Sequence, residues 1–463
     1  MTIAVLLLPP VVDPITHPTP LTPLSAAAFG VMAIAAFFVA LRRPAWAMGL
    51  IAFAIPFAFY RDILGTTLTF EKVVIVGVAM GLVVRGAPLV PAGASARRIM
   101  LAALAVLGTT MLSGIGATHL WPVARESLKF AEYIVMFWCA ASLVLECRDD
   151  TRWLEGGVIA ATIIVALDAV SQALIGGAPS GVWVNDQPLP RVAGPLEGPN
   201  QLAGYLETAL PLLILSPLLL GRSFASLRWV AIAAAMMALV LSQSRSGIAV
   251  AILGYGIVWL LDRRSARQAL LPFVVGTGVG LSIALFWYWG ATHDVMETLS
   301  NLFRLVLPRS PGGVGTRNEL WVAAWTLFVQ HPFTGVGAGN FEFLLPSVGL
   351  PNVQTHANSL WLQTLAEQGL VGFAALIVLV AVVLRECAAG LRRSWLCQAA
   401  FIATVCLLLH QVFDDLLFFP KIGLLWWLLL GAAAGAMATV TATAQARPAT
   451  ATAELREHAT PVA

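Results

Sequence analysis

The chain has few charged side chains. Asp, Glu, Lys and Arg make up 11% of its 463 residues, apolar residues make up 59%, and the mean hydropathy is +0.84. A soluble globular protein cannot have this composition, because too much apolar surface would face water. The sequence also lacks the alternating pattern of an outer-membrane barrel, and apolar runs of about 17 to 24 residues recur instead. Composition therefore predicts an all-α polytopic membrane protein.

Cysteine is also scarce. The five cysteines lie within predicted membrane spans or at their inner ends, at positions 139, 147, 387, 397 and 406. They form no outer disulfide framework and have no metal-ligand spacing. The glycines at 335, 337 and 339 follow no predicted strand, so they do not indicate a nucleotide-binding loop. We predict no cofactor, no metal ion and no nucleic-acid partner.

The apolar runs predict about 12–13 transmembrane helices. Residues 1–440 would form one transmembrane domain that includes a large, mostly helical outer loop at 292–365. Residues 441–463 are rich in Ala, Thr and Pro and would form a disordered inner tail. The predicted spans are 22–41, 44–60, 70–86, 99–117, 128–146, 154–176, 199–220, 228–242, 246–261, 268–290, 366–384, 395–413 and 418–438.

Basic residues predict the orientation of these spans. One set of alternate loops, together with the tail, contains 17 of the 27 lysines and arginines. Short loops rich in basic residues stay on the cytoplasmic side. We therefore expect the N-terminus and the loop at 292–358 to lie outside, and the C-terminus inside.

Polar residues in the predicted outer loops form four segments. Arg191 opens RVAGPLEGPNQLAGYLE (191–207), and Arg245 lies in LSQSRSGIAVAI (241–252). Arg317 begins a predicted helix in TRNELWVAAWTLFVQHPFTGVGAGNF (316–341). His356 and Asn358 lie in THANSLWLQTLAEQGLVG (355–372). An outer loop does not need basic residues for its topology, so these arginines are candidates for function.

Together, these four segments resemble the O-antigen ligase and O-antigen polymerase superfamily of bacterial envelope glycosyltransferases. The resemblance covers roughly residues 190–440, in the same order, with a large outer loop followed by three closing spans. It implies a multi-pass enzyme of the bacterial inner membrane whose active site faces the periplasm. It also implies metal-independent, inverting transfer of a glycan from an undecaprenyl diphosphate carrier to an acceptor hydroxyl.

The chemistry of the residues fits this role. Arginine binds a diphosphate through two parallel hydrogen bonds, so Arg191, Arg245 and Arg317 are the candidates for stabilising the leaving group. The acceptor hydroxyl needs a base near neutral pH, and imidazole is suited to that task, which makes His356 the candidate. Alternatively, the arginines only anchor lipid phosphates or helix ends, and Arg245 extends to the outer head groups.

The position of the base departs from the family pattern. In most members the histidine lies eleven residues before the first glycine of the closing Gly-x-x-Gly, which here is Gly369. Asn358 occupies that position, and His356 aligns with an optional second histidine. Either residue is therefore a candidate for the catalytic position, and Asn358 has the alternative role of capping the next helix.

Four more polar residues fall within or beside predicted spans. Asp168 and Glu207 each lie about eight residues from the outer end of a span, roughly 12 Å at helical rise. His410 and Asp414 are spaced to share one helix face near the same side. Polar groups at such depth are expected to line a watered cavity or to pair with one another.

The favoured function is ligation of O-antigen to lipid A-core, with membrane lipids around the enzyme. Polymerisation of O-antigen or exopolysaccharide repeat units uses the same donor and remains an alternative, with a polysaccharide as acceptor. A transporter of lipid-linked glycans would use the buried polar groups as an ion relay. The chain shows no inverted repeat, which disfavours the transporter, and a structural membrane subunit is the remaining alternative.

Overall fold

The computed structural model describes residues 21–57, 60–63, 66–147, 151–175, 180–184, 187–217, 222–303, 316–351 and 353–457. In chain order, the elements of this part of the chain are α2 (Pro23–Arg42), α3 (Pro44–Ala54), β1 (Tyr60–Ile63), β2 (Thr66–Thr69), α4 (Phe70–Val84), α5 (Ala94–Leu112), η1 (Ser113–Gly116), α6 (Leu120–Glu146), α7 (Arg152–Ile175), β3 (Ser180–Val184), β4 (Gln187–Arg191), α8 (Pro199–Leu215), α9 (Arg222–Ser242), α10 (Arg245–Leu261), α11 (Arg263–Thr292), α12 (Val295–Phe303), α13 (Arg317–Gln330), α14 (Phe341–Leu344), η2 (Leu345–Val348), α15 (Leu360–Gly390), α16 (Trp395–His410), η3 (Leu416–Phe418) and α17 (Pro420–Glu457).

A helix overlaps each of the thirteen predicted spans. Among the described residues, seven helices are long and apolar enough to cross a membrane, and four shorter ones are apolar. The long ones are α2, α5 with η1, α6, α7, α11, α15 and α17, and the shorter ones are α3, α9, α10 and α16. The prediction of an all-α, multi-pass membrane protein is therefore confirmed.

Two short β-hairpins were not predicted. β1 pairs with β2, and β3 pairs with β4, both antiparallel. The first hairpin follows α3, which ends at Ala54, whereas the predicted span continues to residue 60. Pro56 contributes to the early end, because proline lacks the N–H that would continue the helical hydrogen bonds.

Helix α17 is the centre of the bundle. In its most apolar window, 89% of the residues are buried, and it packs along α6. At Gly431 and Gly435 of α17, a Cβ atom would collide with the carbonyl oxygens of Phe137 and Ala141 on α6. Small residues let two membrane helices approach this closely, and the resulting van der Waals contact holds them together.

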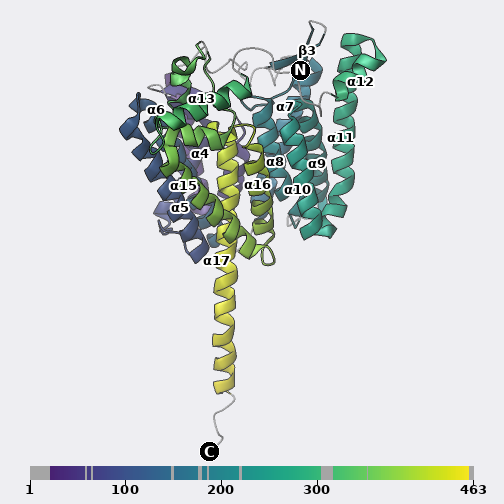
Figure 1. Cartoon of the computed structure of the whole chain (residues 1–463). Coiled ribbons are helices and arrows are strands. Elements are labelled where there is room, and N and C mark those ends of the chain that lie inside the picture. Colours follow the sequence, from purple (N-terminus) through teal and green to yellow (C-terminus); the bar gives the residue numbers. More distant parts are fainter. Residues whose placement is uncertain are drawn as a thin grey trace, which may run out of the picture.

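The outer cap lies at one end of the bundle, opposite the end where α17 extends beyond it (Figure 1). It includes α12, α13, α14 and η2, which lie within the loop predicted at 292–365; residues 304–315 of this loop are outside the described part. Leu320, Ala324, Phe341 and Leu345 form a second hydrophobic core, which also includes Ala366 of α15. The cap is therefore packed onto the first turns of α15.

A glycine loop docks into a break in α15. Gly369 has a φ of 61° and a ψ of −161°, so α15 is two helical segments joined at this residue. The N–H of Val336 donates to the carbonyl of Ala366 (3.0 Å), and that of Gly337 donates to the carbonyl of Glu367 (2.9 Å). Gly335 and Gly337 have φ values of 67° and 98°, which glycine adopts without strain. The predicted tight glycine loop is confirmed, and its role is to hold the cap on α15.

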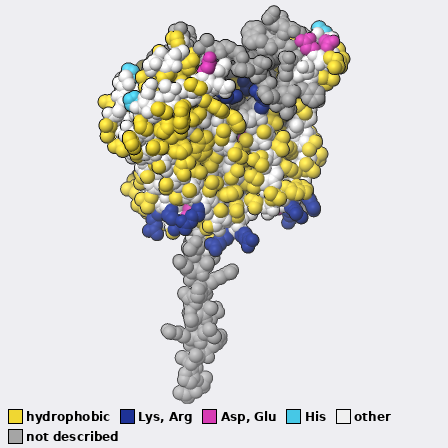
Figure 2. Space-filling view, viewed as in Figure 1, with side chains coloured by type: hydrophobic (Ala, Val, Ile, Leu, Met, Phe, Trp, Pro, Cys, Tyr) yellow, Lys and Arg dark blue, Asp and Glu magenta, His cyan; other side chains and the backbone are white. Residues whose placement is uncertain are grey.

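The surface has a broad apolar band with basic side chains along one edge, where α17 leaves the bundle (Figure 2). Basic residues favour the cytoplasmic side, so this edge supports the predicted orientation. Helix α17 continues through Glu457, past residue 440, where the sequence predicts the start of a disordered tail. The division into domains stays a prediction.

We expect the cap to face outward and the basic edge to face inward. On a background without the five native cysteines, Ser347→Cys in the exposed cap should react with an impermeant thiol reagent in intact spheroplasts. Arg393→Cys, which is exposed at the opposite edge, should react only after lysis. Labelling in the reverse order would show that the orientation is wrong.

Candidate functional site

A chain of hydrogen bonds joins the outer ends of β4, α8 and α16. Arg191, the last residue of β4, donates from Nη2 to Oδ1 of Asn200 in the first turn of α8 (3.3 Å). The Nδ2 of Asn200 donates to Oδ2 of Asp414 (2.6 Å). Arg191 also donates from Nε to the carbonyl of Ser242 (3.1 Å), at the end of α9. The chain of bonds therefore connects the start of α8 with Asp414, which lies 214 residues after Asn200.

Asp414 lies beyond the end of α16, not on it. The helix ends at His410, and residues 411–415 turn back toward α17. The expectation that His410 and Asp414 share one helix face is therefore wrong. The turn lets Oδ1 of Asp414 accept the backbone N–H of Asp415 (2.8 Å), and it buries the carboxylate, whose residue is 1% exposed.

His356 faces Asp414. Its Nε2 lies 3.9 Å from Oδ1 of Asp414, and its Nδ1 accepts the backbone N–H of Asn358 (3.1 Å). A neutral imidazole whose Nδ1 accepts a hydrogen bond has its proton on Nε2, here on the side of the carboxylate. The ring is buried and contacts the ring of Phe418, with centroids 5.2 Å apart. The carboxylate thus lies within ion-pair distance of the imidazole.

Asn358 is not the cap of the next helix. Ser359 is the N-cap of α15, and Asn358 precedes it with a φ of 50°. Asparagine is one of the few residues other than glycine that adopts this left-handed conformation readily. The capping alternative is therefore wrong, and the backbone of Asn358 accounts for the residue type. Its carbonyl accepts the indole N–H of Trp321 (3.4 Å), which ties the segment to α13.

A second chain of buried polar groups connects α8, α16 and α10. Oε2 of Glu207 lies 2.8 Å from Nδ1 of His410, and Nε2 of His410 lies 2.8 Å from Oγ of Ser246. The side chains of Glu207 and His410 are fully buried. Ser246 directly follows Arg245 in the first turn of α10. Ser246 was not among the predicted site residues, although it lies next to Arg245 in the sequence.

The chain of polar groups that ends at Asp414 and the chain that contains His410 lie close enough to interact electrostatically. Glu207, Asp414 and Arg317 all contribute electrostatically at His410. Arg317 is exposed in the first turn of α13, where Thr316 and Glu319 form a capping box. The N-terminal end of α13 therefore brings a positive charge to the outer side of the site.

Asp168 has a different role from the other predicted residues. Its Oδ2 accepts a hydrogen bond from Nε2 of Gln172 (3.2 Å), one turn later on α7. Gln172 accepts the backbone N–H groups of Ala193 and Gly194 (3.0 Å each) and donates to the carbonyl of Gly194 (2.8 Å). Asp168 thus orients a glutamine that holds the turn after Arg191, and no sequence pattern indicated this.

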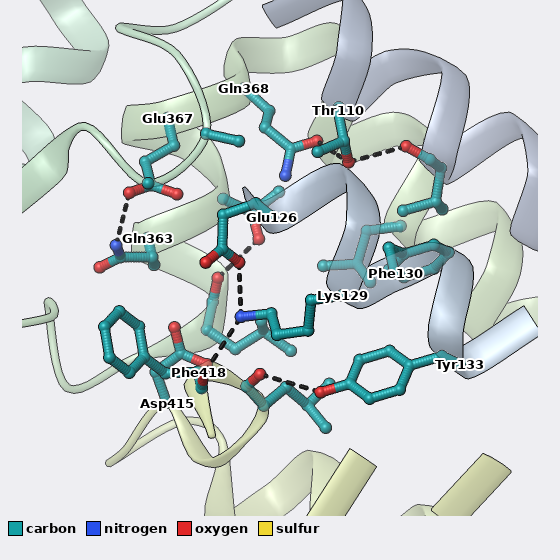
Figure 3. Close-up of a pocket in the computed structure, with 18 residues that line it drawn as sticks. Thr110, Glu126, Lys129, Phe130, Tyr133, Gln363, Glu367, Gln368, Asp415 and Phe418 are labelled. Carbon is teal, nitrogen blue, oxygen red and sulfur yellow. Dashed lines mark hydrogen bonds and ion pairs between the residues drawn. The ribbon is translucent and has the colours of Figure 1, made fainter. Parts of the chain in front are cut away.

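A cavity of about 100 Å³ lies beside the site (Figure 3). Helices α5, α6 and α15, the glycine loop and the η3 turn surround it. Its polar lining is Thr110, Glu126, Lys129, Tyr133, Gln363, Thr364, Glu367, Gln368 and Asp415. Burial raises the pKa of the Asp415 carboxyl, and the nearby positive charge of Lys129 opposes this rise. No sequence pattern placed a site here, although Glu126 and Lys129 lie one turn apart in the outer half of α6.

Comparison with known proteins supports the resemblance. Residues 229–377 match the family model described as O-antigen ligase. Residues 229–377 are therefore similar to the O-antigen ligase family. No curated protein matches the chain. The predicted resemblance to the O-antigen ligase and polymerase superfamily is confirmed, and it implies a glycosyltransferase-like membrane enzyme.

The O-antigen ligase match covers only part of the site. It includes Arg245, Arg317, His356 and Asn358. The remaining site residues, which are Arg191, Asn200, Glu207, His410 and Asp414, lie outside it. The folded chain brings both groups to the same end of the bundle. Among the described residues, no group of three or more His, Cys, Asp and Glu side chains is arranged to hold a metal ion.

The Glu207–His410 pair should be important for stability. His410→Ala leaves a buried carboxylate without its partner, which typically costs about 3–5 kcal/mol. We therefore expect a large fall in the thermal unfolding midpoint in detergent. Ser246→Ala should lower the midpoint less, because the lost hydrogen bond contributes only about 1 kcal/mol to the free energy of unfolding. His331→Ala, the same change at an exposed position, is the control and should have little effect. Equal midpoints for His410→Ala and His331→Ala would contradict the pairing.

Proposed function

We propose that this protein transfers a glycan from an undecaprenyl diphosphate carrier to an acceptor hydroxyl, and that the favoured reaction is ligation of O-antigen to lipid A-core. The observation that carries the proposal is the His356–Asp414 pair, which lies in a polar cluster together with Arg191. A base and guanidinium groups at one end of a membrane bundle are what a lipid-diphosphate donor and a hydroxyl acceptor require.

His356 is the proposed general base, and Asp414 orients it. The acceptor hydroxyl would replace the N–H of Asn358 at Nδ1 and give its proton to that nitrogen. The Nε2–H would point to the Asp414 carboxylate, which stabilises the imidazolium as it forms. The acceptor oxygen forms the new bond to the anomeric carbon while the bond from that carbon to the diphosphate breaks. A single displacement of this kind inverts the anomeric centre.

The arginines are proposed to stabilise the departing diphosphate. Arg191 is oriented by Asn200 and the end of α9, and Asn200 links it to Asp414. Arg245 begins α10, and Arg317 begins α13. These three side chains come from separate elements, and a charged leaving group between them would receive hydrogen bonds from several directions.

Envelope glycans in a deletion strain test the reaction. Loss of a ligase leaves free lipid A-core together with long lipid-linked chains. Loss of a polymerase instead leaves single repeat units on lipid A-core. Lipid-linked glycans that accumulate on the inner leaflet would indicate a transporter and would contradict the proposal.

Substitutions at the base should separate its chemistry from its backbone geometry. His356→Ala and Asp414→Asn should each lower kcat by roughly 10²-fold or more, with donor binding nearly unchanged, since proton transfer acts in the transition state. Asn358→Gly should retain activity, because glycine adopts the same positive φ and provides the same N–H. Activity in His356→Ala together with none in Asn358→Gly would assign the catalytic role to the asparagine side chain.

The arginine substitutions should have a different signature. Arg317→Ala and Arg245→Ala should weaken both donor binding and turnover, because a contact to the diphosphate exists in the ground state and strengthens in the transition state. Lysine should restore activity only in part, since it lacks the planar two-pronged donor. A change in kcat with the donor KM unaltered would argue against contact with the diphosphate.

Transfer should not depend on a divalent cation, because guanidinium groups neutralise the leaving group. The purified protein should keep its activity in a chelator. Activity that is lost and then restored by Mg²⁺ or Mn²⁺ would show that a metal ion takes part.

A further inference from the structure

One buried carboxylate oxygen is left without a partner at the wall of the cavity in Figure 3. Asp415 is 4% exposed, and within the described part of the chain its Oδ1 makes no hydrogen bond. A buried acceptor without a donor costs free energy that a hydrogen bond would recover. Because Asp415 lines the cavity, a ligand bound there could supply the missing donor.

The other walls of the cavity specify the chemistry of that ligand. Glu126, Glu367 and Asp415 contribute carboxyl groups, and Lys129 is the single basic side chain of the lining. Lys129 already pairs with Glu126 and donates to the carbonyl of Phe418 (3.1 Å). A phosphate would therefore meet an excess of acidic groups, whereas a ligand rich in hydroxyl donors would meet acceptors.

Aromatic side chains complete the lining. Phe130, Tyr133 and Phe418 supply flat apolar surface beside the carboxyl and amide groups. A sugar ring presents apolar C–H faces and hydroxyl edges, so a wall of this mixed kind is complementary to it. The volume of about 100 Å³ is several times the minimum for one buried water. The cavity therefore has room for part of a sugar ring.

The cavity adjoins the proposed base. Asp415 follows Asp414 directly, and the ring of Phe418 contacts both the cavity and the ring of His356. Oδ2 of Asp414 accepts a hydrogen bond from Asn200, which in turn accepts one from Arg191. Arg191 is thus linked through Asn200 to Asp414, whereas the acidic cavity is lined by the next residue, Asp415. This separation matches a donor diphosphate on one side and an acceptor on the other.

We propose that this cavity binds a sugar ring of the acceptor, with Oδ1 of Asp415 accepting a hydrogen bond from one of its hydroxyl groups. The proposal rests on the proposed glycosyl transfer and adds where the acceptor binds. It assigns Asp415 to acceptor recognition and Asp414 to the base.

Asp415→Ala in the full-length protein, reconstituted in nanodiscs, tests the assignment. Loss of one hydrogen bond to a charged group should raise the KM for a lipid A-core acceptor roughly tenfold, with the donor KM unchanged. The unfolding temperature should rise, because an unsatisfied buried carboxyl has been removed. A merely structural role for Asp415 would lower that temperature.

Glu386→Ala is the matched control. This buried carboxyl lies at the opposite end of α15, where Arg98 and Ser95 donate to its oxygens. Its loss should leave both KM values unchanged and lower the unfolding temperature. Asp415→Ala and Glu386→Ala are thus expected to move stability in opposite directions.

The possible outcomes distinguish failure of the acceptor-site proposal from failure of the proposed glycosyl transfer. An unchanged acceptor KM in Asp415→Ala overturns the proposal, and a raised donor KM overturns it by assigning the cavity to the donor sugar. If the wild-type protein transfers no glycan, the proposed function fails. Binding of delipidated core oligosaccharide then tests whether the cavity is a sugar-binding site. Binding that Asp415→Ala weakens roughly tenfold supports the site, and equal binding to both proteins overturns it.

Discussion

The hydrogen bond between Asn200 and Asp414 joins parts of the chain that are 214 residues apart. It satisfies a carboxylate that would be costly to bury alone, and it connects Arg191 on one side with His356 on the other. The same turn exposes Asp415 to the cavity. The proposed leaving-group, base and acceptor sites are therefore organised around one buried turn between α16 and α17.

The outer cap depends on a backbone interaction rather than on side chains. The break at Gly369 leaves carbonyl groups of α15 without helical partners, and the glycine loop at residues 335–337 supplies N–H donors to two of them. This docking places α13 over the site, where Trp321 holds the backbone of Asn358. The glycines are thus structural, because a Cβ atom at Gly335 would collide with the backbone of Glu367 in the broken helix.

Much of the architecture could be predicted from the sequence, because a membrane span must be an apolar helix that satisfies its own backbone. Each predicted span has its helix, and α13 occurs where Arg317 begins an aromatic-rich segment. The resemblance to the O-antigen ligase family followed from polar segments in outer loops, which topology alone does not require. The two hairpins could not be predicted, since strands of four or five residues have too short a pattern to distinguish them from loops.

The sequence by itself determined the class of the protein, its spans and the polar residues available for chemistry. Only the tertiary structure decided how they pair. It linked Asp168 through Gln172 to the turn after Arg191, joined Ser246 to the Glu207–His410 pair, and placed Asp415 at a cavity. These pairings depend on the rotation and depth of each helix in the bundle. Packing against neighbouring helices sets both, and one-dimensional hydropathy contains no information about either.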